Sequence, residues 1–185
     1  MRQAISALGG IYQLGYVATD MAAAVEDWTR TYGVGPFYEI PKVEDFLVES
    51  RYYGAASNIC FAASLGYWGR QQIEIIVPTN DAPSIYRDWI ESGRRGIHHL
   101  CVTVDDLEPG RRILLEAGAV LAQELTIAGG GGAIYFDLGE AADVRYLELY
   151  QLAPGQADMY AAMEAEARTW DGSNPFRMIE MDESR

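Results

Sequence analysis

Basic residues, histidine and cysteine are all scarce in this sequence. Of 185 residues, 14 are Lys or Arg against 27 Asp or Glu, which gives a formal net charge of -13. A nucleic-acid-binding surface needs clustered positive charge, and anionic membranes attract basic segments. The charge balance therefore argues against nucleic acid and against a membrane as partners.

Long apolar runs are absent too. No stretch approaches the roughly 20 apolar residues that cross a bilayer, and the start, "MRQAISALGGIYQLGY", lacks the apolar core and cleavage site of a signal peptide. The two cysteines, Cys60 and Cys101, match no metal-binding or redox spacing, so we expect free thiols. These features together predict a cytoplasmic protein.

What the sequence does contain is an internal repeat. The stretch "IYQLGYVATDMAAAVEDWTRTYGV" from Ile11 matches "IHHLCVTVDDLEPGRRILLEAGAV" from Ile97. Each copy reads as an apolar strand, an Asp that can cap a helix (Asp20 or Asp106), and an amphipathic helix. Further strand patterns follow in each copy, at residues 36–40, 58–65 and 71–78 and at residues 120–126, 133–138 and 144–152. The repeat predicts an α+β fold of two tandem βαβββ modules with a C-terminal helical tail.

The repeat also sets the expected organisation of the chain, as one structural domain. We expect a first module over residues 8–80, a linker over 81–95 with a short helix near 85–92, a second module over 96–152, and a C-terminal helical extension over 153–185. Gln13 to Glu74 spans 61 positions against 49 from His99 to Glu148, so the first module has extra residues, placed near "KVEDFLVESRYYG". In the extension, a helix over roughly 156–170 would line up Met159, Met163 and Trp170, as is typical of core or subunit packing.

Four polar positions stand out within the apolar strands. Gln13 and His99 occupy matched positions in the first strands, and Glu74 and Glu148 in the last strands. Because strand side chains alternate between two faces, a sheet that curls until these strands meet would bring the four together. One imidazole, one amide oxygen and two carboxylates, without a thiolate, suit one divalent metal ion: Zn, Ni, Co, Mn or Mg.

Each of these positions also has a purely structural interpretation. A buried Glu74 or Glu148 would need a partner, and Arg70 or Arg145 could supply one. The Gln13 amide could bond within the sheet, and a lone histidine on an apolar strand is often a satisfied core residue.

Strand alternation makes two further predictions. His98 precedes His99 directly, so it should face away from the site. Five residues share the faces of the proposed ligands and are candidates for contact with substrate: Gln72, Cys101, Thr103, Tyr146 and Tyr150.

The paired modules and the motifs "GIHHLCVTVDDLE", "QIEIIVP" and "YLELY" resemble the vicinal oxygen chelate superfamily. This superfamily includes glyoxalase I, methylmalonyl-CoA epimerase, extradiol dioxygenases and bleomycin-resistance proteins. The resemblance covers roughly residues 10–152 and implies a curled, cleft-enclosing mixed β-sheet. It implies metal ligands at Gln13, Glu74, His99 and Glu148, an order similar to the Gln, Glu, His, Glu of eukaryotic glyoxalase I. Many members have His where this chain has Gln13.

The resemblance implies a metal-dependent isomerase, epimerase or lyase that removes a proton next to a metal-bound carbonyl. Glu148 would be the base and Glu74 its counterpart. The alternative is a metal-independent binding protein of the bleomycin-resistance type. A ring-cleaving dioxygenase is disfavoured, because its two-His, one-carboxylate iron site would need His at position 13. The stretch "DAPSIYRDWIESGRRGIHHLCV" resembles methylmalonyl-CoA epimerases, whereas the ligand set resembles glyoxalase I, so the substrate stays open. We expect a small-molecule substrate and a homodimer.

Overall fold

The two copies of the repeat fold into equivalent units of the computed structural model, which describes residues 5–179. The first unit comprises β1 (Gln13–Val17), α2 (Met21–Tyr32), β2 (Phe37–Ile40), β5 (Phe61–Trp68) and β6 (Gln71–Pro78). The second comprises β7 (Ile97–Thr103), α4 (Leu107–Glu116), β8 (Val120–Ile127), β9 (Gly132–Asp137) and β10 (Tyr146–Gln151). The predicted α+β fold of two βαβββ modules is confirmed.

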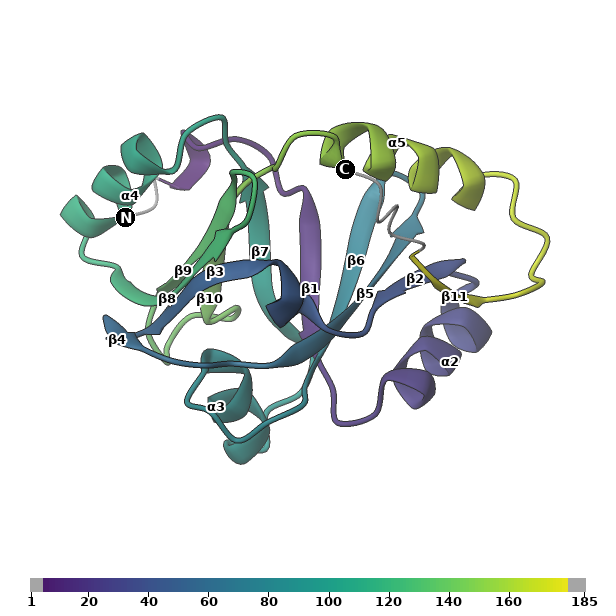
Figure 1. The fold of residues 1–185 in the computed structure, drawn as a ribbon, viewed down its shortest axis with the longest axis horizontal. Helices are drawn as coiled ribbons and strands as arrows, with labels where there is room; N and C mark the ends of the chain where they lie inside the picture. The colour runs from purple at the N-terminus through teal and green to yellow at the C-terminus, as the bar shows by residue number, and fades with distance from the viewer. Residues whose placement is uncertain (1–4, 180–185) are drawn as a thin grey trace.

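The units join through their first strands into one curled, mixed sheet (Figure 1). β1 pairs antiparallel with β7, and each of these strands lies parallel to the last strand of its own unit, β6 or β10. Within residues 5–179, the eleven strands run in the order β11-β2-β5-β6-β1-β7-β10-β9-β8-β3-β4. The four strands that carry the proposed ligands are therefore neighbours at the centre of the sheet.

The predicted aspartate caps begin the two repeated helices. The Asp20 carboxylate accepts from Ala23 N at 3.0 Å, and the Asp106 carboxylate accepts from Glu108 N at 3.0 Å. Each bond satisfies a backbone N–H that has no partner within the helix. The connecting segment carries α3 (Ile85–Glu91), close to the predicted short helix.

Side-chain alternation divides the central strands between a face covered by α2 and α4 and a concave face. In β6, Ile73 and Ile75 belong to the core beneath α2, so Glu74 between them points to the concave side. β10 repeats the pattern, with Glu148 between two leucines of the core beneath α4. A third core cluster, rich in tyrosine, fills the concave side with residues of α3 and α5 (Gln156–Ala167).

The extra residues of the first module form η1 (Val43–Phe46), β3 (Leu47–Tyr52) and the short β4 (Ala55–Ala56). β3 pairs antiparallel with β8 of the second module. Figure 1 shows this segment running in front of β1 and β7 from one end of the curled sheet to the other. It pairs with the backbone N–H and C=O groups at the edge of β8, which would otherwise be free, and it covers the concave side of the sheet.

The C-terminal segment also returns to the sheet. α5 ends three residues before the predicted limit at Trp170, whose ring lies beside Gly35, where a Cβ would come within 2.7 Å of it. Met163 is buried in the concave core and Met159 packs against it. After α5, β11 (Phe176–Met178) pairs parallel with β2. Met159 and Met163 of α5 thus pack within the chain.

Residues 5–179 contain neither a disulfide nor a helix long and apolar enough to span a membrane. Cys101 is a buried free thiol and Cys60 a half-buried one.

Candidate metal centre

Three of the four predicted ligands meet on the concave side of the sheet. His99 Nε2 lies 3.2 Å from Glu74 Oε2 and 3.1 Å from Glu148 Oε2, and the three ligand atoms lie within 4.8 Å of one another. The His99 side chain is fully buried, and those of Glu74 and Glu148 are 15% and 5% exposed. Arg145, a possible partner for Glu148, instead pairs with Asp137 at 2.7 Å.

These three atoms fit a divalent cation. All three are buried, and none of them makes a hydrogen bond of suitable geometry. A buried carboxylate oxygen without a partner is unfavourable, and two such oxygens facing one imidazole nitrogen are more so. A divalent ion between them would satisfy all three atoms with ligands of a type that zinc, nickel, cobalt and manganese accept.

The protonation of the metal-free cluster leads to the same conclusion. Burial raises the pKa of Glu74 by disfavouring its charged form. Burial also disfavours a charged His99, but the attraction of the nearby Glu148 and Glu74 carboxylates more than offsets it and raises the pKa of His99 to about 9. Without a metal, the proton on His99 therefore supplies the positive charge that the two carboxylates need.

Gly15 makes room for the His99 ring. The two residues are opposite one another in the β1–β7 pair. A Cβ on Gly15 would lie 1.8 Å from His99 Cε1, far inside van der Waals contact. The His99 ring can therefore occupy its position only because the residue opposite it in β1 is a glycine.

His98 does not face away, contrary to the sequence prediction. The pairing of β1 with β7 shifts register between Gly15 and Tyr16, whose partners are His99 and Ile97, so His98 is an extra residue without a partner in β1. Such a bulge breaks the two-residue alternation. As a result His98 is fully buried and its Nδ1 lies 3.0 Å from His99 Nδ1.

The hydrogen bonds of His98 define which nitrogen of His99 is free. His98 Nε2 lies 3.3 Å from the carbonyl oxygen of Ile85, which can only accept, so this nitrogen carries a proton. Burial lowers the pKa of His98 well below its usual value, so the ring is neutral and its Nδ1 accepts from His99 Nδ1. The neutral form of His99 then presents the lone pair of Nε2 to the two carboxylates. Outer partners of this kind fix the orientation of metal-binding histidines.

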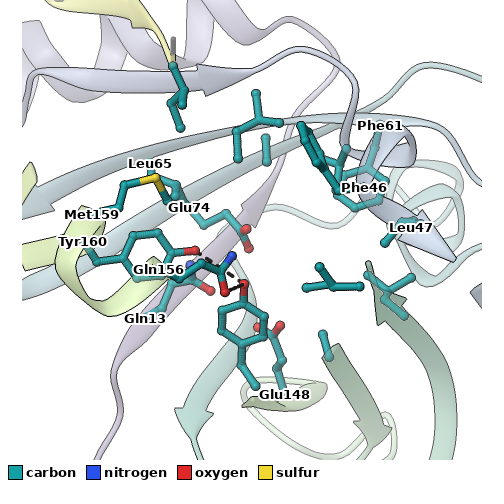
Figure 2. Close-up of a pocket in the computed structure, with 18 of the residues that line it drawn as sticks. Gln13, Phe46, Leu47, Phe61, Leu65, Glu74, Glu148, Gln156, Met159 and Tyr160 are labelled. Carbon is teal, nitrogen blue, oxygen red and sulfur yellow. Dashed lines mark hydrogen bonds between the residues drawn. The ribbon is translucent and has the colours of Figure 1, made fainter. Parts of the chain in front are cut away.

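The fourth predicted ligand, Gln13, is held by a second chain of hydrogen bonds. Gln13 Nε2 donates to Gln72 Oε1 at 2.7 Å, and Gln72 Nε2 donates to the Tyr67 hydroxyl at 2.7 Å. The amide nitrogen of Gln13 is therefore engaged within the sheet, whereas its amide oxygen is left for another partner. Gln13 lines the same cavity as Glu74 and Glu148, and Figure 2 shows it beside them.

That cavity has a volume of about 280 Å³ and lies between the central strands, η1, β3 and α5. Figure 2 shows the two carboxylates pointing toward each other, with Phe46, Leu47 and Phe61 across the cavity. The segments outside the repeat contribute much of the wall: Val43, Phe46, Leu47, Pro154, Gly155, Gln156, Met159, Tyr160 and Ile179. These residues were not predicted from the sequence, because the repeat has no counterpart for them.

Of the five predicted substrate contacts, only Tyr150 lines the cavity. Gln72 lies behind Gln13, and Cys101 is buried in the core. Thr103 borders a different hollow, and the Tyr146 ring packs 4.8 Å from the His98 ring. Alternation identifies the face of a strand but not whether a residue on that face reaches the cavity.

Comparison with known proteins agrees with this geometry. The model of the Glyoxalase/Bleomycin resistance protein/Dioxygenase superfamily matches residues 12–136. No curated protein sequence matches significantly. Among solved structures, methylmalonyl-CoA epimerase from Mycobacterium tuberculosis is similar, with a TM-score of 0.56 at 20% identity over 80% of this chain and 91% of that chain. A variant of the Streptomyces coelicolor epimerase in complex with 2-nitronate-propionyl-CoA gives a TM-score of 0.54 at 17% identity, covering 78% of this chain and 94% of that chain.

At these identities the structural likeness concerns the fold, while the family match covers most of the chain. The paired modules, the curled sheet and the cluster on its concave side are consistent with that match. The chain belongs to the glyoxalase/bleomycin resistance/dioxygenase superfamily, whose fold is that of the vicinal oxygen chelate proteins.

Proposed function

We propose that this protein is a metal-dependent isomerase, epimerase or lyase that moves a proton at a carbon next to a carbonyl group. The observation that carries the proposal is the set of three buried, unbonded atoms, His99 Nε2, Glu74 Oε2 and Glu148 Oε2, at the wall of a cavity. Three such atoms have a clear use as ligands of one ion, and the cavity gives a substrate access to both carboxylates.

A divalent ion bound here would act as a Lewis acid toward the carbonyl oxygen of the substrate. The chain itself supplies the groups that carry protons. Glu74 comes from β6 and Glu148 from β10, on opposite sides of the β1–β7 pair, and both line the cavity. A carbon seated between them would meet one carboxylate from each module.

In this proposal Glu148 removes the proton from the carbon. A proton is then returned either by Glu148 on the same side or, from a proton that Glu74 carries, by Glu74 on the opposite side. His99 and Gln13 anchor the ion, His99 through Nε2 and Gln13 through its amide oxygen. The apolar wall excludes water from the reacting carbon. Cytoplasmic location and a homodimer are further predictions, which cell fractionation and light scattering would check.

The test combines metal analysis with isotope exchange. Purified protein is loaded in turn with zinc, nickel, cobalt, manganese and magnesium, and bound metal is measured after dialysis. Exchange of the carbon-bound proton for deuterium is then followed by NMR in D₂O with 2-hydroxyacetophenone, methylglyoxal–glutathione hemithioacetal and methylmalonyl-CoA. We expect one metal per chain, and metal-dependent exchange with at least one of these compounds.

The Glu148→Gln variant should slow exchange by roughly 10²–10⁴-fold, the usual contribution of a positioned acid or base. Glu140→Gln, in the exposed loop before β10, is the matched control and should exchange normally. A protein that binds no divalent ion after loading would contradict the proposal. Ligand binding that a chelator does not affect, without any exchange, would favour the binding protein of the bleomycin-resistance type.

A further inference from the structure

We propose that the substrate is an uncharged, compact and mainly hydrocarbon molecule, rather than an acid or a conjugate of coenzyme A or glutathione. The inference rests on the proposed function in two respects: one divalent ion is taken to be bound at the centre, and the carbonyl end of the molecule is taken to face Glu74 and Glu148. Everything else comes from the wall, the charge and the surroundings of the cavity.

The wall offers almost nothing to an anion. No Lys or Arg is found among the described residues that line the cavity. Its apolar side chains are Ile40, Val43, Phe46, Leu47, Phe61, Ala63, Leu65, Leu125, Ile127, Ala133, Pro154, Met159 and Ile179. A charged group pressed against such a wall would lose its water without gaining a partner.

The few hydroxyl groups of the wall are already engaged with one another. The Tyr150 hydroxyl donates to Gln156 Oε1 at 2.9 Å and lies 3.5 Å from the Tyr160 hydroxyl. The Tyr135 hydroxyl lies 3.1 Å from that of Tyr86. These hydroxyls are held in pairs, so a carboxylate or phosphate of the substrate would have to break existing bonds to gain a hydroxyl donor, and the side-chain nitrogen of Gln156 offers only a neutral one.

The charge of the centre points the same way. One divalent ion and the two carboxylates of Glu74 and Glu148 sum to zero, so no net positive charge is left for an acidic substrate. The formal net charge of -13 adds no attraction for an anion.

The neighbourhood of the cavity does not favour a phosphate-bearing carrier. η1 and α5 both line the cavity, and neither contains a Lys or Arg. They carry the exposed residues Asp45 and Asp158 instead. The basic residues at their ends are the caps Lys42 of η1 and Arg168 of α5, and Arg168 pairs with Glu164. The volume of about 280 Å³ lies just below the roughly 300–1,000 Å³ typical of ligand pockets. This size suits a molecule of about one ring.

The experiment compares two probes with the same reactive end. 2-Hydroxy-4′-methylacetophenone is neutral, and 4-(2-hydroxyacetyl)benzoate replaces its methyl group by a carboxylate at the far end. Binding of each to the metal-loaded protein is measured by calorimetry, together with binding of methylmalonyl-CoA. We expect the neutral probe to bind at least tenfold more tightly than either anion. Equal or tighter binding of an anion, or no measurable binding of the neutral probe, would overturn the inference.

Met159 provides a matched pair of variants. It lies half-buried on α5 and lines the cavity, and lysine has an unbranched stem of similar length. Met159→Lys should reduce or reverse the preference for the neutral probe, whereas Met159→Gln, polar but uncharged, should keep it. Circular dichroism checks that both variants fold, and if they do not, the two probes on the unaltered protein decide alone.

These outcomes separate the inference from the proposed function. Preference for the neutral probe without deuterium exchange would support the inferred class of ligand and contradict the proposed enzymatic activity. Exchange with methylmalonyl-CoA or the glutathione hemithioacetal, together with tighter binding of anions, would support the proposed enzymatic activity and contradict the inferred class of ligand.

Discussion

The two modules place residues at equivalent backbone positions but hold them by different chemistry. In the first module, Gln13 is fixed through its amide nitrogen, which donates to Gln72. In the second, His99 is fixed through Nδ1, which bonds to His98. Each first-strand residue thus has one atom tied to the sheet and another left for the site. The repeat conserves this arrangement of atoms rather than the residue type.

The difference lies in charge and burial. The amide of Gln13 never titrates, whereas the imidazole of His99 carries the proton that balances the carboxylates in the metal-free protein. Glu148 of the second module is also more buried than Glu74 of the first. We infer that the second module determines whether a metal binds, and that the first module mainly completes the coordination.

The largest expected effect tests this difference between the two modules directly. His99→Ala removes the only nitrogen of the cluster, and should weaken metal binding by more than the roughly 100-fold that loss of an outer partner can cause. Gln13→Ala removes a neutral oxygen that water can replace, and should weaken it by about tenfold or less. Competition with a chromogenic chelator measures both. Equal losses in the two variants would show that the modules contribute equally.

The comparison also shows what sequence could predict. The repeat matched Gln13 with His99 and Glu74 with Glu148, and alternation placed them on one face, because period-two patterns are local properties of strands. The bulge at His98 was not predictable, since it depends on how β7 pairs with β1. The crossing of β3 to β8 was not predictable either, since nothing local in residues 47–52 specifies the distant strand.

The next prediction uses two glycines that each face a ring in one module. A Cβ on Gly15 would lie 1.8 Å from the His99 ring, and one on Gly66 would lie 2.8 Å from the Phe37 ring. Overpacking of this kind typically destabilises by about 1–3 kcal/mol, so both Gly15→Ala and Gly66→Ala should lower the melting temperature. Only Gly15→Ala should also abolish tight metal binding, because it displaces a ligand.

Thermal unfolding and metal titration on the same two samples check this prediction. Retention of full metal affinity by a folded Gly15→Ala variant would mean that the position of the His99 ring does not matter for the ion.

A third prediction concerns His98 and Gln72, the residues that hydrogen-bond to the proposed ligands His99 and Gln13. His98→Phe keeps the aromatic packing on Trp89 and Tyr146 but leaves His99 Nδ1 without an acceptor. We expect metal binding to weaken by about 10–100-fold. Gln72→Met frees the Gln13 amide in the same way, and should have a smaller effect, because an amide oxygen is the weaker ligand. A larger effect from Gln72 would reverse the ranking of the modules.

A change of one proton, rather than of a side chain, should give a graded pH dependence of metal binding that belongs to the second module alone. With the pKa of His99 raised to about 9 in the metal-free protein, its proton must leave before Nε2 can bind an ion. Metal affinity should rise about tenfold per pH unit above neutrality and level off above pH 9, with one proton released per ion. Calorimetry in buffers of different ionisation enthalpy counts that proton. His98→Phe should still release it, since His98 is neutral at these pH values.

The same proton affects the stability of the fold, and the direction in which stability changes with pH can be measured separately. A histidine pKa raised above its unfolded value of roughly 6.5 stabilises the fold below that pH and loses the contribution as pH rises through the folded value. The metal-free protein should therefore lose stability between about pH 6.5 and pH 9, as His99 loses the charge that balances Glu74 and Glu148. A bound ion replaces that charge at every pH. The gap in melting temperature between loaded and metal-free protein should widen over this range, and a constant gap would show that the proton on His99 does not stand in for the metal.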